Sequence, residues 1–332
     1  MISVVIVNWN RKELLRACLG SLAAQRNVHF ETIVVDNGST DGSAEMAARE
    51  FGVQVICNAE NRGFCAANNQ GIAAARGELI ALLNNDAEAE PDWLAELARA
   101  CSSREDVGMA ASKVLVWEDP RRIDKAGHLI FPDGQNRGRG SGALDEGQFD
   151  REEEVLWPDG CAAMYRKRML DEIGGFDEDF FAYGDDAELG LRARIAGWKC
   201  VYAPRAVVRH HRGSTLGKDS GRRLELIERN RVLLAVKLFP WSLLWLNPVY
   251  FAVRLAAGAA KAGRGEGDTA HFPGWSGKLR IARALAAGDW QALRMLPRML
   301  RKRAEIARLR RLDPREVRRL ILANRLGLRE VA

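Results

Sequence analysis

The sequence predicts an α/β protein with an open, mostly parallel central sheet, followed by a mainly helical C-terminal part. Apolar runs at Ile2–Val7 and Leu79–Leu83 are continuous rather than alternating, which is typical of strands that are buried on both faces. Lys12–Gln25 carries apolar residues at helical spacing. Because strands and helices alternate with short connections up to residue 101, the pattern favours parallel strands joined by crossover helices.

The elements of this alternating region can be assigned in order along the chain. The expected strands are Ile2–Val7, Phe30–Val35, Val53–Cys57 and Leu79–Leu83. The expected helices are Lys12–Gln25, a second helix capped by Asp41 or Ser43, Phe64–Arg76, and a fourth from Pro91 to Cys101. Pro91 suits the first position of a helix, where the missing amide donor is not needed.

The chain is less regular beyond residue 101. Residues 118–156 are rich in glycine and charge, and Gly134–Gly147 is expected to be a mobile surface loop. Lys199–Tyr202 and Ala206–Val208 are expected to be strand-like. From Glu225 onward the spacing is helical. Breaks in the helices are expected at Pro240, Pro248, Gly263–Gly267, Pro273 and Pro297.

Length and composition exclude several classes of protein. The chain of 332 residues is 47% hydrophobic and 28% charged, which excludes a disordered chain, a collagen and a multi-span membrane protein. None of the six cysteines lies in a C-x-x-C pair, so we expect reduced cysteines and no structural zinc. The N-terminus lacks the basic region of a signal peptide, and no run of 18 uncharged apolar residues predicts a spanning helix.

Charge is distributed unevenly along the chain. Residues 261–332 hold 18 Lys/Arg and 7 Asp/Glu, a net charge of +11, whereas residues 1–260 have a net charge of −5. A basic C-terminal part on an acidic body suggests an anionic partner, such as a membrane surface, a lipid diphosphate or a nucleic acid. No nucleic-acid-binding motif accompanies the charge, so a nucleic-acid partner is not expected.

Polar clusters follow three of the expected strands, at Asn8–Asn10, Asp36–Asp41 and Asn84–Asp86. Ligands of open parallel sheets bind at the carboxyl ends of the strands, where these clusters fall. Asp86 beside two asparagines suits a hard divalent cation that also contacts substrate phosphates, although a turn or a helix cap explains it as well. Asp36 suits a nucleobase or ribose contact, with an Asx-turn as the simpler explanation.

Two further clusters have the composition of catalytic or metal sites. Residues 176–188 place six carboxylates among aromatic side chains, where crowding raises at least one pKa and produces a candidate general base. The alternative is a helix start, with Asp185 or Asp186 as the N-cap of Ala187–Ala196. His210 and His211 are adjacent, and one of them could ligate a metal; a hydrogen-bonded or surface pair is the alternative.

Taken together, these segments resemble the inverting glycosyltransferases of family 2, and most closely a rhamnosyltransferase-like subset of that family. Seven stretches carry the resemblance in the family's order, across roughly residues 2–215. They are VVIVNWN (4–10), VVDNGSTDGS (34–43), NRGFCAANNQGI (61–72), ALLNNDAEAEPDWL (81–94), WPDGCAAMYRKRML (157–170), GGFDEDFFAYGDDAELGLRARIAGW (174–198) and HHRGST (210–215). The resemblance implies a GT-A fold, which is a Rossmann-like sheet flanked by helices.

The resemblance also implies a role for each matching residue. The nucleotide-binding residues would be Asn8, Asp36, Asn61, Arg62 and Asn85. The metal ligands would be Asp86 and His210, and the acceptor would be bordered by Trp157, Asp159 and Gly160. Asp186 would be the catalytic base, in an acidic pair with Asp185. Two positions depart from the family's pattern: Asn84 replaces the first aspartate of the D-x-D-like motif, and the acidic pair is Asp-Asp rather than Glu-Asp.

The implied activity is metal-dependent transfer of a sugar from a nucleoside diphosphate sugar to a hydroxyl group, with inversion and with Mg²⁺ or Mn²⁺ as cofactor. The favoured donor is dTDP-rhamnose, and the acceptor would be a glycan or a polyprenyl-linked sugar of bacterial surface polysaccharides. The alternatives are a UDP-hexose or UDP-galactofuranose transferase, or a non-catalytic nucleotide-sugar-binding scaffold. The three carboxylates and the histidine of the implied site count against the scaffold.

The expected domains are a GT-A domain at residues 1–215 and a helical, basic region at residues 216–332. Basic residues beside tryptophan and leucine in the second region suit an anionic membrane surface. We therefore expect a cytoplasmic protein that is peripheral on the inner face of the membrane. The alternative is a helical subdomain that only packs on the catalytic domain.

Overall fold

A computed structural model describes residues 1–211, 221–262 and 274–331. These residues divide into two compact units. The first unit comprises residues 1–128 and 138–214, and the second comprises residues 129–137 and 215–332. Some of the expected features lie outside the described residues. They are part of the motif at 210–215 and the expected helix breaks at Gly263–Gly267 and Pro273.

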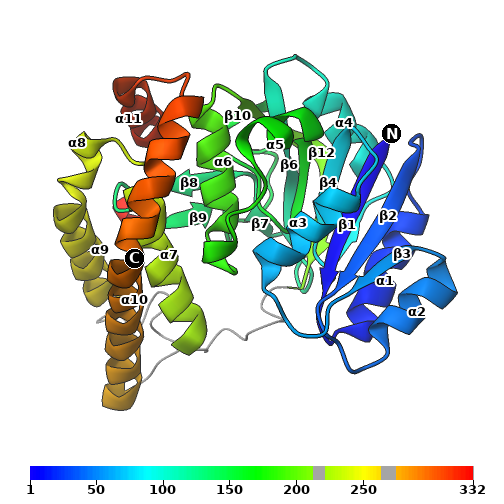
Figure 1. Cartoon of the computed structure of the whole chain (residues 1–332), viewed down its shortest axis with the longest axis horizontal. Helices are drawn as coiled ribbons and strands as arrows, with labels where there is room; N and C mark the ends of the chain where they lie inside the picture. Colours follow the sequence, from blue (N-terminus) through cyan, green and yellow to red (C-terminus); the bar gives the residue numbers. More distant parts are fainter. Residues whose placement is uncertain (212–220, 263–273, 332) are drawn as a thin grey trace. The chain divides into compact units, whose positions relative to one another are not determined.

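The first unit is built on one large mixed sheet (Figure 1). Its strands are β1 (Ile2–Asn8), β2 (Phe30–Asp36), β3 (Gln54–Cys57), β4 (Leu79–Leu83), β5 (Ala87–Ala89), β6 (Val107–Val116), β7 (Ile123–Lys125), β10 (Glu153–Val155), β11 (Ala162–Arg166) and β12 (Lys199–His210). The main order is β10-β12-β6-β11-β4-β1-β2-β3, with β5 paired to β12 and β7 paired to β6. A separate pair, β8 (His128–Ile130) and β9 (Asn136–Gly138), forms a two-stranded sheet.

The sheet is parallel where the sequence predicts parallel strands. Strands β3, β2, β1 and β4 run parallel in adjacent positions, and Asn8 lies opposite Asp36 in the register of β1 and β2. Beyond β4 the sheet becomes mixed, because β11 runs antiparallel to both β4 and β6. Strand β12 pairs in parallel with β6 and has an irregularity between Ala203 and Val207. That irregularity separates the two strand-like segments expected from the sequence.

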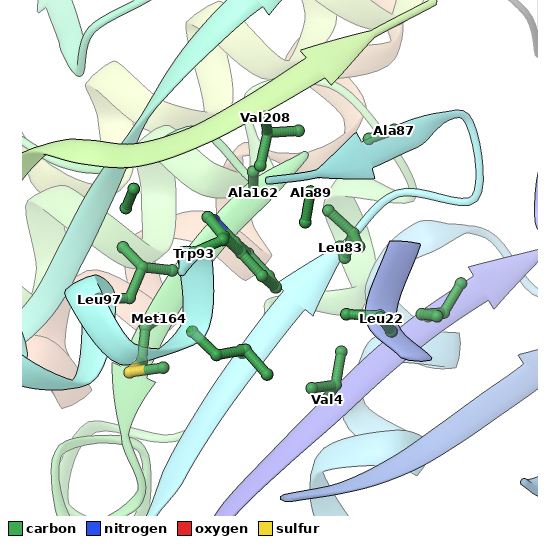
Figure 2. Close-up of a cluster of buried hydrophobic side chains, with 14 of the residues drawn as sticks. Val4, Leu22, Leu83, Ala87, Ala89, Trp93, Leu97, Ala162, Met164 and Val208 are labelled. Carbon is green, nitrogen blue, oxygen red and sulfur yellow. The ribbon is translucent and has the colours of Figure 1, made fainter. Parts of the chain in front are cut away.

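Helices cover both faces of this sheet. The helices of the first unit are α1 (Lys12–Ala23), α2 (Ser43–Phe51), α3 (Phe64–Ala74), α4 (Trp93–Cys101), α5 (Lys167–Ile173) and α6 (Asp185–Ile195), with a 3₁₀ turn η1 (Glu178–Phe180). On one face, Leu22 of α1 and Trp93 of α4 pack with alternate sheet residues such as Val4 in one buried cluster (Figure 2). Helix α3 covers the other face, where Gly71 approaches the side chain of Val5.

Several local expectations are wrong in detail. Helix α4 begins at Trp93 with Asp92 as its N-cap, so Pro91 precedes the helix. Gly42 and Gly184 cap α2 and α6 in left-handed conformations, in place of the aspartates and the serine expected there. The carboxylate of Asp41 still accepts the amide of Ser43. Residues 118–156 are more regular than expected, because β7 pairs with β6, β10 pairs with β12, and β8 and β9 pair with each other.

The second unit is helical, as the spacing predicts. Its helices are α7 (Gly221–Leu238), α8 (Trp241–Leu244), α9 (Asn247–Ala262), α10 (Gly274–Leu309), α11 (Pro314–Ala323) and α12 (Leu328–Val331). Pro240 separates α7 from α8, but Pro248 lies in the first turn of α9 and Pro297 lies inside α10. These two prolines therefore do not break helices. Among the described residues, no helix is both long and apolar enough to cross a membrane.

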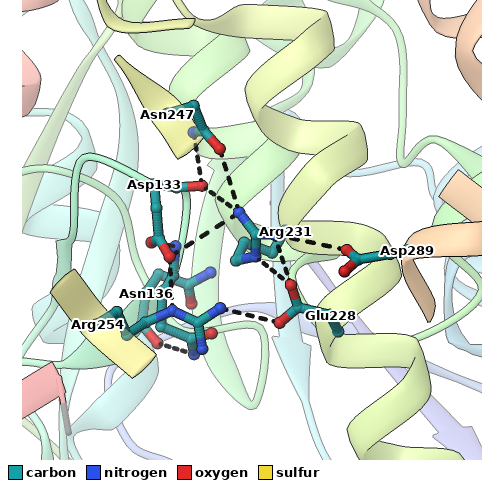
Figure 3. A network of polar contacts seen from close by, with 8 residues as sticks. Asp133, Asn136, Glu228, Arg231, Asn247, Arg254 and Asp289 are labelled. Atoms are coloured by element: carbon teal, nitrogen blue, oxygen red, sulfur yellow. Dashed lines mark hydrogen bonds and ion pairs between the residues drawn. The ribbon is translucent and has the colours of Figure 1, made fainter. Parts of the chain in front are cut away.

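A buried ion-pair network holds the second unit together (Figure 3). The Arg231 guanidinium lies 2.5 Å from Oε1 of Glu228 and donates to the backbone carbonyl of Asp133 at 2.9 Å. Arg254 reaches the carboxylate of Asp133 at 2.5 Å and that of Glu228 at 3.0 Å. Burial alone would raise the pKa of Glu228, but the two arginines lower it. The network thus ties residue 133 to α7 and α9.

Replacing Arg231 should destabilise the second unit markedly. In Arg231→Ala, Glu228 keeps Arg254 but loses its closest cation in a buried setting, and we expect a loss of about 3 kcal/mol of unfolding free energy. The matched control is Arg222→Ala in the same helix, which removes an exposed pair with Glu225 and should cost under about 1 kcal/mol. Urea denaturation measures both losses. Equal losses would contradict the assignment of the network as a structural element.

Candidate active site

Three polar side chains meet at the carboxyl ends of β1, β2 and the segment after β4. The Nδ2 atom of Asn8 donates to Oδ2 of Asp36 at 3.2 Å, and Nδ2 of Asn85 donates to Oδ1 of Asn8 at 2.7 Å. All three residues are buried. The parallel register of β1 and β2 places Asn8 and Asp36 side by side. The carboxylate of Asp36, a hydrogen-bond acceptor, therefore lies at the carboxyl ends of these strands.

The turn after β2 is ordered by side-chain amides. The carboxamide of Asn37 donates to Oδ1 of Asn61 at 2.9 Å, and the backbone amide of Arg62 donates to Oδ1 of Asn37 at 3.1 Å. Gly38 has φ +83°, and a Cβ there would lie 2.9 Å from the backbone of Glu60. The structure thus brings Asn61 and Arg62 to the loop that follows Asp36.

Asp86 and His210 form a second cluster beside this edge. The Nε2 atom of His210 lies 3.4 Å from Oδ1 of Asp86, and its Nδ1 lies 2.8 Å from Oδ2 of Asp124 on β7. All three residues are buried. Burial alone would lower the pKa of His210, but its hydrogen bonds to Asp124 and Asp86 raise it to about 9.

This cluster has the donor set of a divalent-cation site. A metal-binding histidine commonly donates from its second ring nitrogen to a carboxylate, which fixes the ring orientation. Asp124 makes that contact with Nδ1, and Nε2 faces the carboxylate of Asp86. A cation held by Asp86 and Nε2 would take the place of the proton that the two carboxylates stabilise on the ring. The residues present therefore fit Mg²⁺ or Mn²⁺.

A third cluster lies around Asp159. Its Oδ2 atom is 2.6 Å from Nζ of Lys125 and 2.8 Å from Nε2 of His128, and its Oδ1 accepts the amide of Cys161 at 2.9 Å. Burial alone would raise the pKa of Asp159, but Lys125 and His128 hold it well below its ordinary value. Lys125 and His128 therefore favour the charged form of Asp159, and its contacts fix the orientation of the carboxylate.

Asp186 adjoins this cluster at the start of α6. Its Oδ2 lies 3.7 Å from Nε2 of His128 and accepts the amide of Gly160 at 3.3 Å, and its side chain is 13% exposed. Burial raises the pKa of Asp186, and His128 opposes that rise. Burial and the charge of Asp186 raise the pKa of Asp185 well above its ordinary value. Asp186 is thus the more accessible carboxylate of the pair.

His128, Asp159 and Asp186 also have the composition of a metal site, since their ligand atoms lie within 4.8 Å of one another. Lys125 argues against a metal there, because its ammonium already contacts the Asp159 oxygen that faces His128. The cluster is therefore better described as a network of carboxylates held by a lysine and a histidine. Sequence reasoning missed Asp124, Lys125 and His128, which lie in the segment expected to be irregular.

The aromatic residues near the site are mostly buried. Trp157 is fully buried, stacks on His128 at a centroid distance of 6.0 Å, and packs against Gly190, where a Cβ would lie 2.2 Å away. Its side chain thus supports His128, and its contact with an acceptor stays a prediction. Gly160 lies 3.6 Å from Asp186 and Phe64, measured from the position a Cβ would occupy.

The loop before Asp186 has strained backbone. Phe181 and Tyr183 have φ of +62° and +68°, values that side chains other than glycine rarely adopt. The carbonyl of Phe181 accepts the amides of Phe64 and Cys65 at the start of α3. Strained residues persist only where surrounding contacts hold them, and here the contact with α3 holds the loop that leads to Asp186.

Comparison with known proteins identifies the family of this chain. Residues 3–174, more than half of the chain, match the family described as glycosyl transferase family 2. An N-acetylglucosaminyl-diphospho-decaprenol L-rhamnosyltransferase of Mycobacterium tuberculosis is 26% identical over 277 residues, which cover 76% of this chain and 89% of the relative. The O-antigen biosynthesis protein RfbC of Myxococcus xanthus is 30% identical over 231 residues, 66% of this chain and 18% of that protein.

Solved structures share the fold. GalNAc-T7 with UDP, GalNAc and Mn²⁺ superposes with a TM-score of 0.59 at 16% identity, over 78% of this chain and 51% of that chain. The mannosyltransferase PcManGT of Pyrobaculum calidifontis, in complex with GDP-Man and Mn²⁺, has a TM-score of 0.53 at 19% identity, over 93% and 85% of the two chains. The expected GT-A fold is confirmed. The chain belongs to glycosyl transferase family 2 and is a nucleotide-sugar glycosyltransferase.

Proposed function

We propose that this glycosyltransferase is metal-dependent and inverting, and that it moves rhamnose from dTDP-rhamnose to a hydroxyl of a lipid-linked acceptor. One observation carries the proposal. Adjacent residues of β7 link the two halves of the site: Asp124 orients His210 beside Asp86, while Lys125 fixes Asp159 beside His128 and Asp186. One short strand therefore contacts both the proposed cation ligand His210 and the cluster around the proposed base Asp186.

The residues at the sheet edge would bind the donor. Asp36 would accept a hydrogen bond from the imide N–H of uracil or thymine, and Asn8 and Asn85 hold it in place. Asn61 and Arg62 follow on the adjoining loop. Asp86 and His210 would hold the divalent cation, which neutralises charge on the departing diphosphate when it is bound.

Asp186 would act as the base. Its Oδ2 takes the proton of the acceptor hydroxyl as that oxygen forms a bond to the anomeric carbon, and the bond between that carbon and the diphosphate breaks. A single displacement inverts the configuration and needs no covalent intermediate, unlike the two-step retaining route. The amide of Gly160 keeps the carboxylate oriented toward the acceptor side.

The relatives' names support the proposed donor sugar and acceptor. The rhamnosyltransferase relative supports rhamnose and a polyprenyl-diphosphate-linked N-acetylglucosamine, and the O-antigen relative supports surface polysaccharide. Labelled dTDP-rhamnose, UDP-glucose and UDP-galactofuranose should be offered with N-acetylglucosaminyl-diphospho-polyprenol and Mn²⁺. Transfer of label into the lipid extract from dTDP-rhamnose alone supports the proposal. Transfer from a UDP-sugar instead would overturn the donor assignment.

His128 is proposed as a positioning residue for the base. Because His128 opposes the rise in the pKa of Asp186, His128→Gln should move the acidic limb of the kcat/KM profile to higher pH. We also expect kcat to fall by roughly tenfold to hundredfold with little change in donor KM. His29→Gln, an exposed histidine, is the control. A uniform loss with an unmoved pH limb would show that His128 is only structural.

A further inference from the structure

Helix α10 presents an apolar stripe to solvent. Five large residues of the stripe are exposed by 45% to 88%, and smaller apolar residues fill the positions between them. The large residues are Trp275, Leu279, Trp290, Leu293 and Leu300. Together with Ala282, Ala286 and Pro297, these residues recur every three or four positions, which keeps them on one side of the helix.

The opposite side of α10 is the one that packs. Its buried residues are Gly277, Ala284, Gly288, Ala292, Met299 and Ile306. At Gly288 the helix approaches α7 so closely that a Cβ would lie 2.6 Å from the carbonyl of Glu225. The apolar stripe is therefore not the face that this helix uses for folding.

Charge along the stripe has one sign. Lys278, Arg280, Arg283, Arg294, Arg298 and Arg301 are exposed between residues 275 and 301. The one acidic residue of that stretch, Asp289, is turned toward Arg231 in the buried network. A helix with a wide apolar face and a basic flank is typical of segments that lie in the plane of an anionic bilayer surface.

Helices α8 and α9 add a second uncharged surface. Between Trp241 and Ala260 every exposed residue is apolar except Ser242, and Trp245 and Val249 are exposed by 80% and 59%. The one charged residue in that stretch, Arg254, points inward to Asp133 and Glu228. Contiguous apolar surface of this extent marks an interaction site.

We propose that the α10 stripe and the exposed face of α8 and α9 bind the surface of an anionic lipid bilayer. The tryptophans and aliphatic residues enter the interface, and the flanking arginines contact lipid phosphates. Charge complementarity favours lipid over a second copy of this chain, because like-charged flanks would repel across a symmetric interface. The inference extends the proposed function by naming the surface that brings the enzyme to a lipid-linked acceptor.

The proposal can be tested by co-sedimentation of the full chain with lipid vesicles. Binding to vesicles of phosphatidylglycerol and phosphatidylcholine is compared with binding to vesicles of phosphatidylcholine alone. Wild type should bind the anionic vesicles, more weakly as salt rises. Arg283→Gln/Arg294→Gln/Arg301→Gln should weaken binding by about a hundredfold, since each arginine near the surface contributes about fivefold. Trp245→Ser/Val249→Ser/Trp290→Ser/Leu293→Ser should weaken it at least about tenfold.

The matched control is Arg26→Gln/Arg151→Gln/Arg168→Gln, which removes three exposed arginines of the first unit and should leave vesicle binding unchanged. Equal losses in the control and the α10 arginine variant would overturn the proposal. A variant that changes from dimer to monomer while its vesicle binding stays intact would assign this face to a second copy instead. Thermal stabilisation by dTDP and Mn²⁺, measured on the same preparations, reports failure of the proposed activity separately.

Discussion

Asp186→Asn should abolish sugar transfer, with kcat reduced by about 10³-fold. Asparagine keeps the size and the acceptor oxygen of the side chain, so the hydrogen bond from Gly160 can persist. It cannot take a proton from the acceptor hydroxyl. Binding of nucleotide and metal should therefore be unchanged, because Asp186 is held by Gly160 and His128. Asp36 accepts a hydrogen bond from Asn8, and Asp86 faces His210. Steady-state kinetics with dTDP-rhamnose measures the loss.

Asp185→Asn is the matched control for that variant. The pKa of Asp185 is raised well above its ordinary value by burial and by Asp186, so asparagine resembles the protonated form that this site favours. We expect a much smaller loss of kcat than in Asp186→Asn. A larger loss would reverse the roles of the two carboxylates.

For the wild-type enzyme, the raised pKa of Asp186 should place the acidic limb of the kcat/KM pH profile above about pH 4, the ordinary range of aspartate.

Asp86→Ala should remove metal-dependent turnover, with a loss of at least about a hundredfold in kcat. The variant removes the carboxylate that faces Nε2 of His210, so the cation would keep one protein ligand of the two proposed. Titration of Mg²⁺ or Mn²⁺ into the transfer assay should show a saturable response in wild type and none in Asp86→Ala. Asp124→Asn should weaken metal affinity by about tenfold to hundredfold, since it acts through His210.

Glu88→Ala provides the control for Asp86→Ala. Glu88 lies two residues further along the chain on β5, and it is partly exposed. Its removal should leave the metal response intact. If Asp86→Ala kept the metal response of wild type, the proposed cation site would be wrong, whatever its total activity.

The parallel half of the sheet could be predicted closely from the sequence. The expected limits of β1, β2, β3 and β4 lie within a residue or so of the observed ones. The signal is strongest for β1 and β4, whose continuous apolar runs are buried in the sheet. The polar residues after those strands then gather at one edge as expected. Asn8, Asp36 and Asn85 are joined by hydrogen bonds there, and Asp86 lies beside His210.

The other half of the site could not be read from the sequence. Asp124, Lys125 and His128 lie in a glycine-rich, charged segment whose strands are only three residues long, too short to show periodicity. Their roles come from partners far along the chain, as with Asp124 and His210. The predicted N-cap residues of α2 and α6 are wrong for a local reason. Gly42 and Gly184 cap these helices in left-handed conformations, which favour glycine over the aspartates beside them.

The second unit shows the same division. Helical spacing predicts its helices, but Pro248 and Pro297 mislead because proline is tolerated in a first turn and can sit within a long helix that packs on a neighbour. The pairing of Asp133 with Arg254 brings together residues that the sequence separates by 121 positions. Only the folded chain shows that these charges are buried and that Asp289 of α10 is turned toward the same network.

The central claim is that Asp36 and Asp86 build one metal-dependent nucleotide site. It is tested most directly by thermal unfolding with dTDP, UDP, GDP or CDP, each with and without Mn²⁺. A ligand that binds only the folded state adds about 2.7 kcal/mol of stability at 100 times its Kd. We predict a Mn²⁺-dependent rise in Tm with dTDP or UDP that is lost in Asp36→Asn and in Asp86→Ala. The claim would be contradicted if no nucleotide raised the Tm of wild type. It would also be contradicted if Asp36→Asn and Asp86→Ala showed the same rise in Tm as wild type.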